Sequence, residues 1–442
     1  QVVTRAPSVI KQLIQWGTKF DKDASGRYDL NREGGHSEHR ILHHKDITGH
    51  EIERALMRRV KRHHNIEIYE HHFAVDILTQ HHLGKLVKKS TPDITCFGAY
   101  VLNLKKHEIY TVLAKITVMA TGGVGNIYHT TTNPAVATGD GIAMVHRAKG
   151  AVENMQFLQF HPTSLYNPGE RPSFLISEAM RGFGALLRLQ NGKEFMHKYH
   201  PMGSLAPRDV VARSIDHEMK ISGDEFVYLD ITHKDPKEVI NHFPNIYQKC
   251  LSVGIDLTKD MIPVVPAAHY CCGGVKVNLN GESSIRHLYA LGETSSTGLH
   301  GGNRLASNSL MEAAVYADVA AQHAISLLNT IELQRNIPAW DYEGTAIPEE
   351  MALITQNYKE MQLIMSNYVG IVRSNLRLER AKRRLEIIFK ETEELYLKST
   401  LSQHLCELRN MIAVGYLIIK QAEAMHESVG LHYSIDYPAK PV

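Results

Sequence analysis

The stretch that decides the fold is Leu288–Leu310, which reads LYALGETSSTGLHGGNRLASNSL. Its first four residues are apolar and predict a buried strand that delivers Glu293 to its carboxyl end. Ligands of open α/β sheets bind at that end of the strands. The glycines that follow allow the backbone to approach a ligand closely. Ser307–Ser309 then begin a long helix, whose free N–H groups and partial positive charge suit an electron-rich ligand edge.

A second strand with a glycine-rich end lies earlier in the chain. Ile116–Ala120 is apolar and runs into Thr121–Gly125, which reads TGGVG. By the same reasoning, Gly122 and Gly123 are candidates for contact with a ligand. Asp140 stands between two glycines where another helix is predicted to begin, so its carboxylate could cap that helix or hold a ribose hydroxyl. The repeated order of strand, glycine turn and helix predicts an α/β fold.

The predicted secondary structure is different in the segments between and after these units. Loops and short helices alternate between residues 155 and 270, which indicates an inserted domain. The last hundred residues are helical, with two apolar stripes that predict a small bundle. One stripe is Leu376, Leu378, Ala381, Leu385 and Ile388, and the other is Leu408, Met411, Ile412, Gly415 and Ile419.

Local patterns predict further elements near the start of the chain. Residues 8–20 and 48–62 have helical apolar spacing, and Thr48 with Glu51 fits a capping box. Short strands are predicted over Ile66–Tyr69, Phe73–Leu78, Cys96–Leu104 and Glu108–Leu113, the last two as a hairpin.

Composition excludes several classes of function. The 442 residues contain 49 Lys and Arg against 47 Asp and Glu, for a formal charge of +2. This balance gives no support to a nucleic-acid or membrane-surface partner, both of which favour a basic surplus. No apolar run approaches the roughly 18 residues of a membrane span. The five cysteines form no Cys-x-x-Cys pair, which favours a reducing, cytoplasmic setting.

The 27 histidines invite a metal-site hypothesis around His36, His39, His43 and His50. No cysteine or carboxylate joins these four at a recognised ligand spacing, so we predict no metal site.

Four further motifs, together with Gly298–Leu310, give the chain a family resemblance from about Gln12 to Pro438. They are Arg32–Ser37 (REGGHS), Gln159–Thr163 (QFHPT), Ala206–Arg213 (APRDVVAR) and Pro266–Gly274 (PAAHYCCGG). With them the sequence resembles the fumarate reductase/succinate dehydrogenase flavoprotein family. The resemblance implies non-covalently bound FAD and a Rossmann-like FAD-binding domain interrupted by an α+β capping domain. We expect the FAD-binding domain at 1–153 and 271–340, the capping domain at 154–270 and a helical bundle at 341–442.

Within that family the resemblance is greatest to the branch that oxidises L-aspartate. It implies hydride transfer from the substrate Cα to flavin N5, which yields iminoaspartate, and reoxidation of the flavin by oxygen or fumarate. The product would enter quinolinate and then NAD synthesis, with quinolinate synthase as a candidate partner.

The residues that would bind a four-carbon dicarboxylate can be named. Such a substrate needs cationic or hydrogen-bonding anchors at both ends, and Arg304 can grip one carboxylate in bidentate fashion. His161 and His269 can donate to carboxylate oxygens. By resemblance these three residues bind substrate, and we add Ser177 to the set. Arg208 matches the family's proton-transfer position, although a guanidinium with a pKa above about 12 is an unusual base.

Glu33 separates the branches of the family. This position is acidic in the aspartate-oxidising branch, where it faces the substrate amino group, and an uncharged amide in fumarate reductases and succinate dehydrogenases. On the cofactor side, the expected FAD contacts are Gly122, Gly123, Asp140, Glu293, Asn308, Ser309 and Leu310. Two positions depart from the family pattern: Phe183 replaces a common Glu, and Val429 replaces a common Arg.

One family feature is missing from the sequence. Flavoproteins of this type begin with a βαβ unit that carries Gly-x-Gly-x-x-Gly and holds the FAD pyrophosphate. No such fingerprint occurs in these 442 residues, so we expect an incomplete FAD-binding domain. Two alternatives therefore stay open. One is a non-enzymatic fragment unable to hold FAD, and the other is a soluble fumarate reductase, which Glu33 disfavours.

Overall fold

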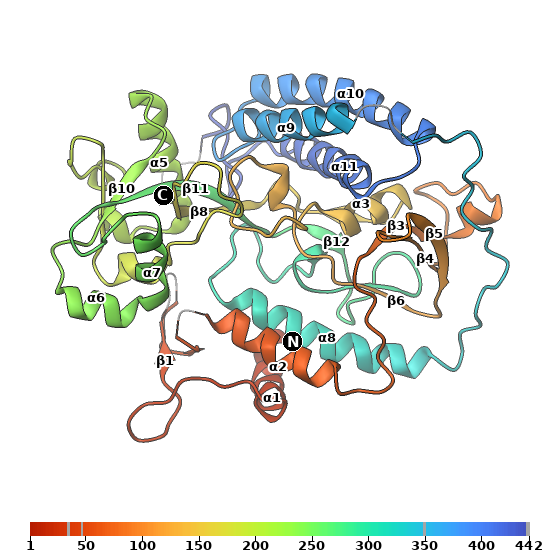
Figure 1. Ribbon diagram of the computed structural model, residues 1–442, viewed down its shortest axis with the longest axis horizontal. Coiled ribbons are helices and arrows are strands. Elements are labelled where there is room, and N and C mark those ends of the chain that lie inside the picture. The colour runs from red at the N-terminus through yellow and green to blue at the C-terminus, as the bar shows by residue number, and fades with distance from the viewer. Residues whose placement is uncertain (33–35, 46, 348–350, 439–442) are drawn as a thin grey trace.

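The computed structural model describes residues 1–32, 36–45, 47–347 and 351–438. It confirms the α/β class with a helical C-terminal region. Figure 1 shows the inserted segment, in yellow and green, at one end of the molecule, and the C-terminal helices, in blue, layered over the remainder. One large hydrophobic core joins the C-terminal helices to the strands and helices outside the inserted segment, and a second core lies inside the inserted segment. The domain boundaries given above stay predictions.

The two strands predicted to carry glycine-rich ends are neighbours. β6 (Thr117–Met119) and β13 (Leu288–Ala290) form a parallel pair in which Met119 lies opposite Ala290. Parallel neighbours end at the same edge of a sheet, so the turns after both strands emerge side by side. The long helix α8 (Asn308–Leu327) follows β13, and α1 (Val2–Gln15) packs against α8 (Figure 1).

Two small sheets complete this region. An antiparallel sheet confirms the predicted hairpin and consists of β3 (His72–Leu78), β4 (Gly98–Asn103) and β5 (Glu108–Leu113). The other sheet consists of β7 (Val152–Glu153), β12 (Gly274–Lys276) and β14 (Ser295–Ser296). The remaining elements here are β1 (Leu30–Asn31), β2 (Ile41–Leu42), α2 (Thr48–Val60) and α3 (Asp140–Arg147).

Two local predictions are wrong. Ile66–Tyr69 forms no strand, and its residues are exposed, because no neighbouring strand of the described chain supplies the hydrogen bonds that a strand needs. The capping box at α2 is also absent. The Glu51 carboxylate accepts hydrogen bonds from Arg54 and from the backbone N–H of Lys19 instead, because tertiary donors compete successfully with the local one.

The inserted segment forms a cap built on one antiparallel sheet. Its strands follow the order β8 (Leu158–Leu165), β11 (Ile262–Cys271), β10 (Val227–Asp230) and β9 (Leu186–Arg188). Its helices are α4 (Glu178–Gly182), α5 (Arg208–Ser222), α6 (Pro236–His242) and α7 (Pro244–Ser252). β8 and β11 are the longest strands of the cap and connect it to the rest of the molecule (Figure 1).

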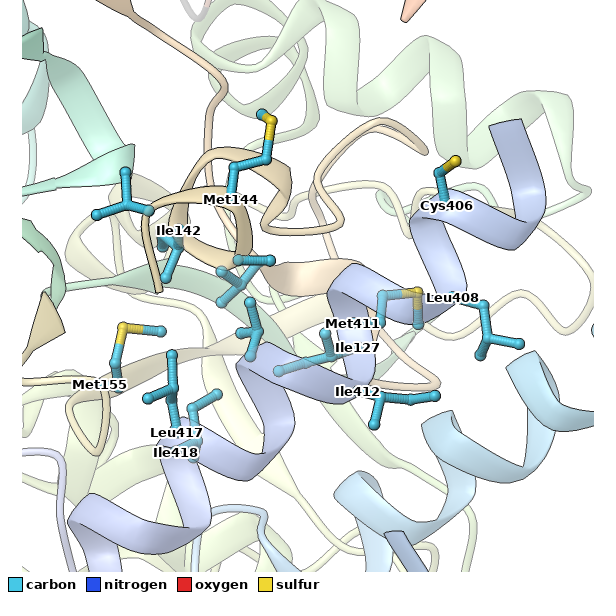
Figure 2. Close-up of a cluster of buried hydrophobic side chains, with 14 of the residues drawn as sticks. Ile127, Ile142, Met144, Met155, Cys406, Leu408, Met411, Ile412, Leu417 and Ile418 are labelled. Carbon is cyan, nitrogen blue, oxygen red and sulfur yellow. The ribbon is translucent and has the colours of Figure 1, made fainter. Parts of the chain in front are cut away.

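The C-terminal helices are α9 (Met351–Tyr368), α10 (Asn375–Lys398) and α11 (Gln403–Glu423), which pack together as predicted. Both apolar stripes are buried except Leu376, whose side chain is exposed. Gly415 allows α11 to approach α9, because a Cβ at this position would lie 2.4 Å from the Met361 Cε. Figure 2 shows Leu417 and Ile418 of α11 near Met155, and one hydrophobic core joins α11 to Ile127 and Ile142, so the bundle rests on the sheet region.

The described residues contain neither a membrane-spanning helix nor a metal-binding cluster. None of the helices there combines the length and apolarity needed to cross a bilayer. Within the same residues, no three His, Cys, Asp or Glu side chains are grouped so that they could hold a metal ion.

Candidate active site

The ends of β6 and β13 bring together three residues expected to contact the cofactor. The Glu293 carboxylate lies against Gly123, where a Cβ would stand only 2.2 Å from Oε1, so glycine is required there. Glu293 Oε1 accepts a hydrogen bond of 2.9 Å from the backbone N–H of Cys271. Gly122 has a left-handed backbone (φ 74°) with open space in place of a side chain. These turns form a glycine-lined edge with one buried carboxylate.

Asp140 reaches the same edge through the backbone. The N–H of Gly139 donates to the carbonyl of Gly123 at 3.1 Å. Asp140 does not cap α3. Its Oδ1 accepts from Thr138 Oγ1 at 3.0 Å and from Asn410 Nδ2 at 2.7 Å. This arrangement leaves Oδ2 for another donor, which is consistent with the predicted ribose contact.

Glu293 makes the stability of the protein depend on pH. Burial raises its pKa to about 7, so the folded protein favours the protonated carboxyl. The stabilisation that this carboxyl group contributes is therefore complete below pH 4.5, which is its pKa in the unfolded chain. It is lost as the pH rises through about 7, which is its pKa in the folded protein. We expect Glu293→Gln to match the parent near pH 4.5 and to exceed its unfolding free energy at pH 8 by about 3 kcal/mol. Thermal or urea unfolding of both FAD-free proteins across that range measures the difference, and a pH-independent difference would contradict it.

The start of α8 connects the cofactor side to the substrate side. Ser307 has a left-handed backbone and is the N-cap of the helix, but its side chain makes no cap hydrogen bond to the first turn, which contains Asn308, Ser309 and Leu310. Ser309 Oγ accepts a hydrogen bond of 3.1 Å from Arg304 Nη1. A group bound at this helix end would therefore lie next to Arg304.

Arg304 is a buried cation held by uncharged groups. Its Nη2 donates to Gln159 Oε1 at 3.1 Å, and its guanidinium lies 4.4 Å from the centre of the Tyr270 ring. Among the described residues, no carboxylate forms an ion pair with Arg304, and its buried Nε has no hydrogen-bond partner. Burial, followed by the nearby charge of Arg208, lowers its pKa. This guanidinium can therefore receive a ligand carboxylate without displacing an ion-pair partner from the described residues.

The two predicted histidines lie together. The rings of His161 on β8 and His269 on β11 are 5.3 Å apart. His161 Nδ1 is held by the backbone of Thr163, and His269 Nδ1 lies 2.8 Å from Thr132 Oγ1. Within the described residues neither ring has a hydrogen bond at Nε2, so both Nε2 atoms can meet a ligand. A β-bulge at His269 aims its side chain, which the sequence did not reveal.

The charge of Arg208 acts on the same two histidines. The pKa of His161 is well below its ordinary value because of burial, then the charge of Arg208. The pKa of His269 is also well below its ordinary value, because of burial and then the charges of Arg304 and Arg208. Both imidazoles are therefore neutral hydrogen-bonding groups at neutral pH. The structure thus gathers Arg208, Arg304, His161 and His269 from four separate motifs.

Sequence reasoning missed the partner of Arg208. Glu178 Oε2 accepts from Arg208 Nε, and Glu178 Oε1 lies 3.2 Å from Arg181 Nη2. Arg181 is only 1% exposed and donates from Nη1 to the carbonyl of Ser204 at 2.8 Å. This chain of arginine, carboxylate and arginine leads away from the site into the cap. The Glu-x-x-Arg spacing on a short helix was the signal available in the sequence.

The remaining predicted residues are placed as follows. Ser177 is the N-cap of α4 and accepts from the N–H of Ala179 at 3.2 Å, so it orients the helix that carries Glu178. Glu33 lies outside the described residues. His36 of the same motif is buried, with Nε2 3.0 Å from the carbonyl of Ala306. This contact brings the REGGHS motif to the segment that carries Arg304.

Comparison with known proteins identifies the family. Residues 1–310 match the FAD binding domain model, and residues 358–441 match the fumarate reductase flavoprotein C-terminal model. The L-aspartate oxidase of Yersinia pestis is 47% identical over 441 residues, which cover 99% of this chain and 82% of that protein. The L-aspartate oxidase of Pseudomonas aeruginosa is also 47% identical, over 99% of this chain and 81% of its own length. The chain belongs to the L-aspartate oxidase family. It is a flavin-dependent oxidoreductase, and its cofactor is FAD.

Solved structures agree with this assignment. An E. coli quinol fumarate reductase superimposes with a TM-score of 0.87 at 28% identity, over 100% of this chain and 78% of that one. A Mycobacterium smegmatis Sdh1 complex with UQ1 gives a TM-score of 0.81 at 28% identity, over 100% and 76%. The predicted fold family is therefore confirmed.

The residues at the glycine-lined edge fit FAD. Gly122, Gly298 and Gly301 have left-handed backbones and open space where a side chain would stand, so a flat ligand can approach. The N-terminal end of α8 suits the electron-rich edge of a flavin. Glu293 and Asp140 would hold hydroxyl groups of the cofactor, and the first turn of α8 would hold its ring.

Several side chains near the site serve packing. The Cys271 and Cys272 thiols are buried, and burial raises both pKa values, that of Cys272 to about 12, so neither is a reactive thiolate. Phe183, one departure from the family pattern, packs against His242 within the cap at 4.6 Å between ring centres. Val429, the other departure, exchanges backbone hydrogen bonds with His432.

Proposed function

We propose that this chain catalyses the FAD-dependent oxidation of L-aspartate to iminoaspartate, with oxygen or fumarate as electron acceptor. The reaction would be the first step of quinolinate and NAD synthesis. The observation that carries the proposal is Arg304, a buried cation without an ion-pair partner among the described residues, next to two neutral histidines. A dicarboxylate supplies the missing negative charge.

Different residues of the site would bind different groups of the substrate. Arg304 binds one carboxylate through its free guanidinium edge, while His161 and His269 donate to the remaining carboxylate oxygens. The buried Tyr270 beneath Arg304 excludes water and keeps the ion pair in a medium of low dielectric. Glu33, by resemblance, faces the substrate ammonium. FAD, when bound, supplies the acceptor for the hydride that leaves Cα, and the amino nitrogen loses a proton as the C=N bond forms.

Arg208 has a different role because it is already paired. In fumarate reduction one olefinic carbon takes up a hydride and the other a proton. The charge of Arg208 acts on His161, so Arg208 would donate that proton, and Glu178, which is hydrogen-bonded to Arg208 and ion-paired with Arg181, would restore it. Burial lowers the pKa of Arg181, which makes it easier for this guanidinium to give up a proton to Glu178.

A soluble fumarate reductase is the second candidate, because the solved relatives include fumarate reductases. We predict that the FAD-loaded protein releases peroxide on addition of aspartate and that Glu33→Gln reduces this rate at least about 100-fold, since the ammonium loses its carboxylate partner. Fumarate reduction by a reduced viologen should persist within about fivefold.

These two assays separate the alternatives. Equal aspartate oxidation by Glu33→Gln and parent would contradict the role of Glu33. Fumarate reduction without aspartate oxidation in the parent would favour the reductase. A protein that stays colourless in excess FAD and shows neither activity would support the non-enzymatic alternative. Glu38→Gln, a change in the same segment outside the motif, is the matched control.

We further propose a cytoplasmic setting and a functional link to quinolinate synthase. All five cysteines are free and buried, as expected in a reducing compartment. The imine product hydrolyses in water, so an enzyme that consumes it promptly would benefit from proximity. Retention of quinolinate synthase on an immobilised sample of this protein, compared with an unrelated flavoprotein, tests the link.

A further inference from the structure

Behind Arg304 lies a buried carboxylate that the proposed reaction does not use. Glu312 is on α8, one helical turn after Ser309, and only 1% of it is exposed. Three donors converge on its carboxylate. Thr297 Oγ1 donates to Oε1, while His300 Nε2 at 2.8 Å and the Tyr270 hydroxyl at 3.3 Å approach Oε2. A carboxylate this deeply buried requires such donors to remain in place.

The network continues directly to the substrate arginine. The Tyr270 ring that donates its hydroxyl to Glu312 is the ring that lies 4.4 Å from the Arg304 guanidinium. The His300 ring meets the same tyrosine edge-on at 5.3 Å between centres. Glu312 therefore fixes the position of the Tyr270 ring, against which the Arg304 guanidinium packs.

The negative charge of Glu312 also affects the electron density of the Tyr270 ring. A phenol that donates to a carboxylate gains electron density in its ring, and a richer ring attracts a cation more strongly. Among the described residues, the side chains in direct contact with the Arg304 guanidinium are uncharged: Gln159, Ser309 and the face of Tyr270. The structure thereby keeps the guanidinium oriented without neutralising it. A directly paired carboxylate would orient it equally well but would compete with the substrate.

We propose that Glu312, acting through Tyr270, is a positioning residue that orients Arg304 for the substrate dicarboxylate. The inference rests on the proposed role of Arg304. Glu312 itself touches neither the substrate nor Arg304. It contributes to dicarboxylate affinity and to the KM for aspartate, whereas the proton route through Arg208 and Glu178 is separate from it.

The test measures binding of succinate, a dicarboxylate that lacks the amino group, by the change it causes in the flavin absorbance spectrum of the FAD-loaded protein. We expect Glu312→Gln to raise the dissociation constant about tenfold, which corresponds to the loss of one charge-assisted contact. The KM for aspartate should rise by a similar factor, and kcat should stay within about twofold. Asp318→Asn, which removes a half-buried carboxylate on the same helix that pairs with Arg5, should change neither value.

A second variant protects the test against misfolding. Tyr270→Phe keeps the ring but removes the hydroxyl that reaches Glu312, and we expect it to raise the succinate dissociation constant about fivefold. The double variant should be no weaker than Glu312→Gln alone, because both changes break one pathway. Additive effects, or unchanged succinate affinity in both single variants, would overturn the proposal. A parent protein that binds no succinate would instead contradict the role of Arg304 in the proposed function.

Discussion

Glu178→Gln should reduce fumarate reduction by about 100-fold to 1,000-fold while leaving oxygen-dependent aspartate oxidation within about fivefold. General acid catalysis by a positioned group contributes factors of this size. The Glu178 carboxylate joins Arg208 to the buried Arg181. An amide at this position cannot accept a proton from one guanidinium and pass it to the other. Fumarate reduction requires a proton delivered to carbon, whereas oxidation of aspartate by oxygen requires none.

The two acceptors serve as internal controls for this variant. Loss of both activities to the same extent would contradict a specific role in proton delivery and would indicate damage to the site. Glu170→Gln is the matched control, since it neutralises another carboxylate of the cap that pairs with a single cation, Lys249. This control should lose neither activity. The KM for fumarate should remain within about threefold of the parent value, because Arg304 and the histidines are untouched.

Arg304→Lys should raise the KM for aspartate by about 100-fold or more. The guanidinium offers a planar, bidentate edge to a carboxylate, and an ammonium cannot reproduce that geometry. Loss of a buried charged contact weakens binding by about 2–5 kcal/mol, and 3 kcal/mol corresponds to more than 100-fold. The fold should tolerate the change, since no carboxylate of the described chain depends on Arg304 for its charge partner. Initial rates across a wide range of aspartate concentrations give the KM.

Arg286→Lys is a suitable comparison for this experiment. Arg286 is a largely exposed arginine that pairs with Asp93 at 3.4 Å, outside the site. The Arg286→Lys protein should have the same KM for aspartate as the parent. An unchanged KM in Arg304→Lys would remove the substrate role of this residue and, with it, the main support for dicarboxylate chemistry.

Much of the fold and site could be predicted because the motifs are local. The strand-turn-helix pattern at Leu288–Leu310 correctly indicated a parallel strand followed by α8. Arg208, Arg304, His161 and His269 could be named from their motifs, and the structure gathers them. The apolar stripes of the last hundred residues gave the helical bundle, since a helix with one apolar face must bury it.

Interactions between distant segments could not be predicted. Glu178 meets Arg208 across 30 positions of sequence, and Glu312 receives a hydrogen bond from Tyr270 across 42. The capping box at Thr48 failed because Glu51 found better donors in Arg54 and Lys19. A hydrogen-bonding group takes the strongest partner available in space, and local sequence does not reveal which partners the fold will supply.

The sequence by itself therefore determined which chemical groups this protein has for a flavin and a dicarboxylate, because glycine turns, helix starts and arginines have their properties wherever they occur. Only the tertiary structure decided how those groups are used. Arg208 and Arg304 are the same residue type, yet Arg208 is paired with Glu178, whereas Arg304 rests on Tyr270 and has no ion-pair partner in the described part of the chain. Burial makes that difference decisive, since an unpaired charge in a medium of low dielectric attracts a ligand far more strongly than one in water.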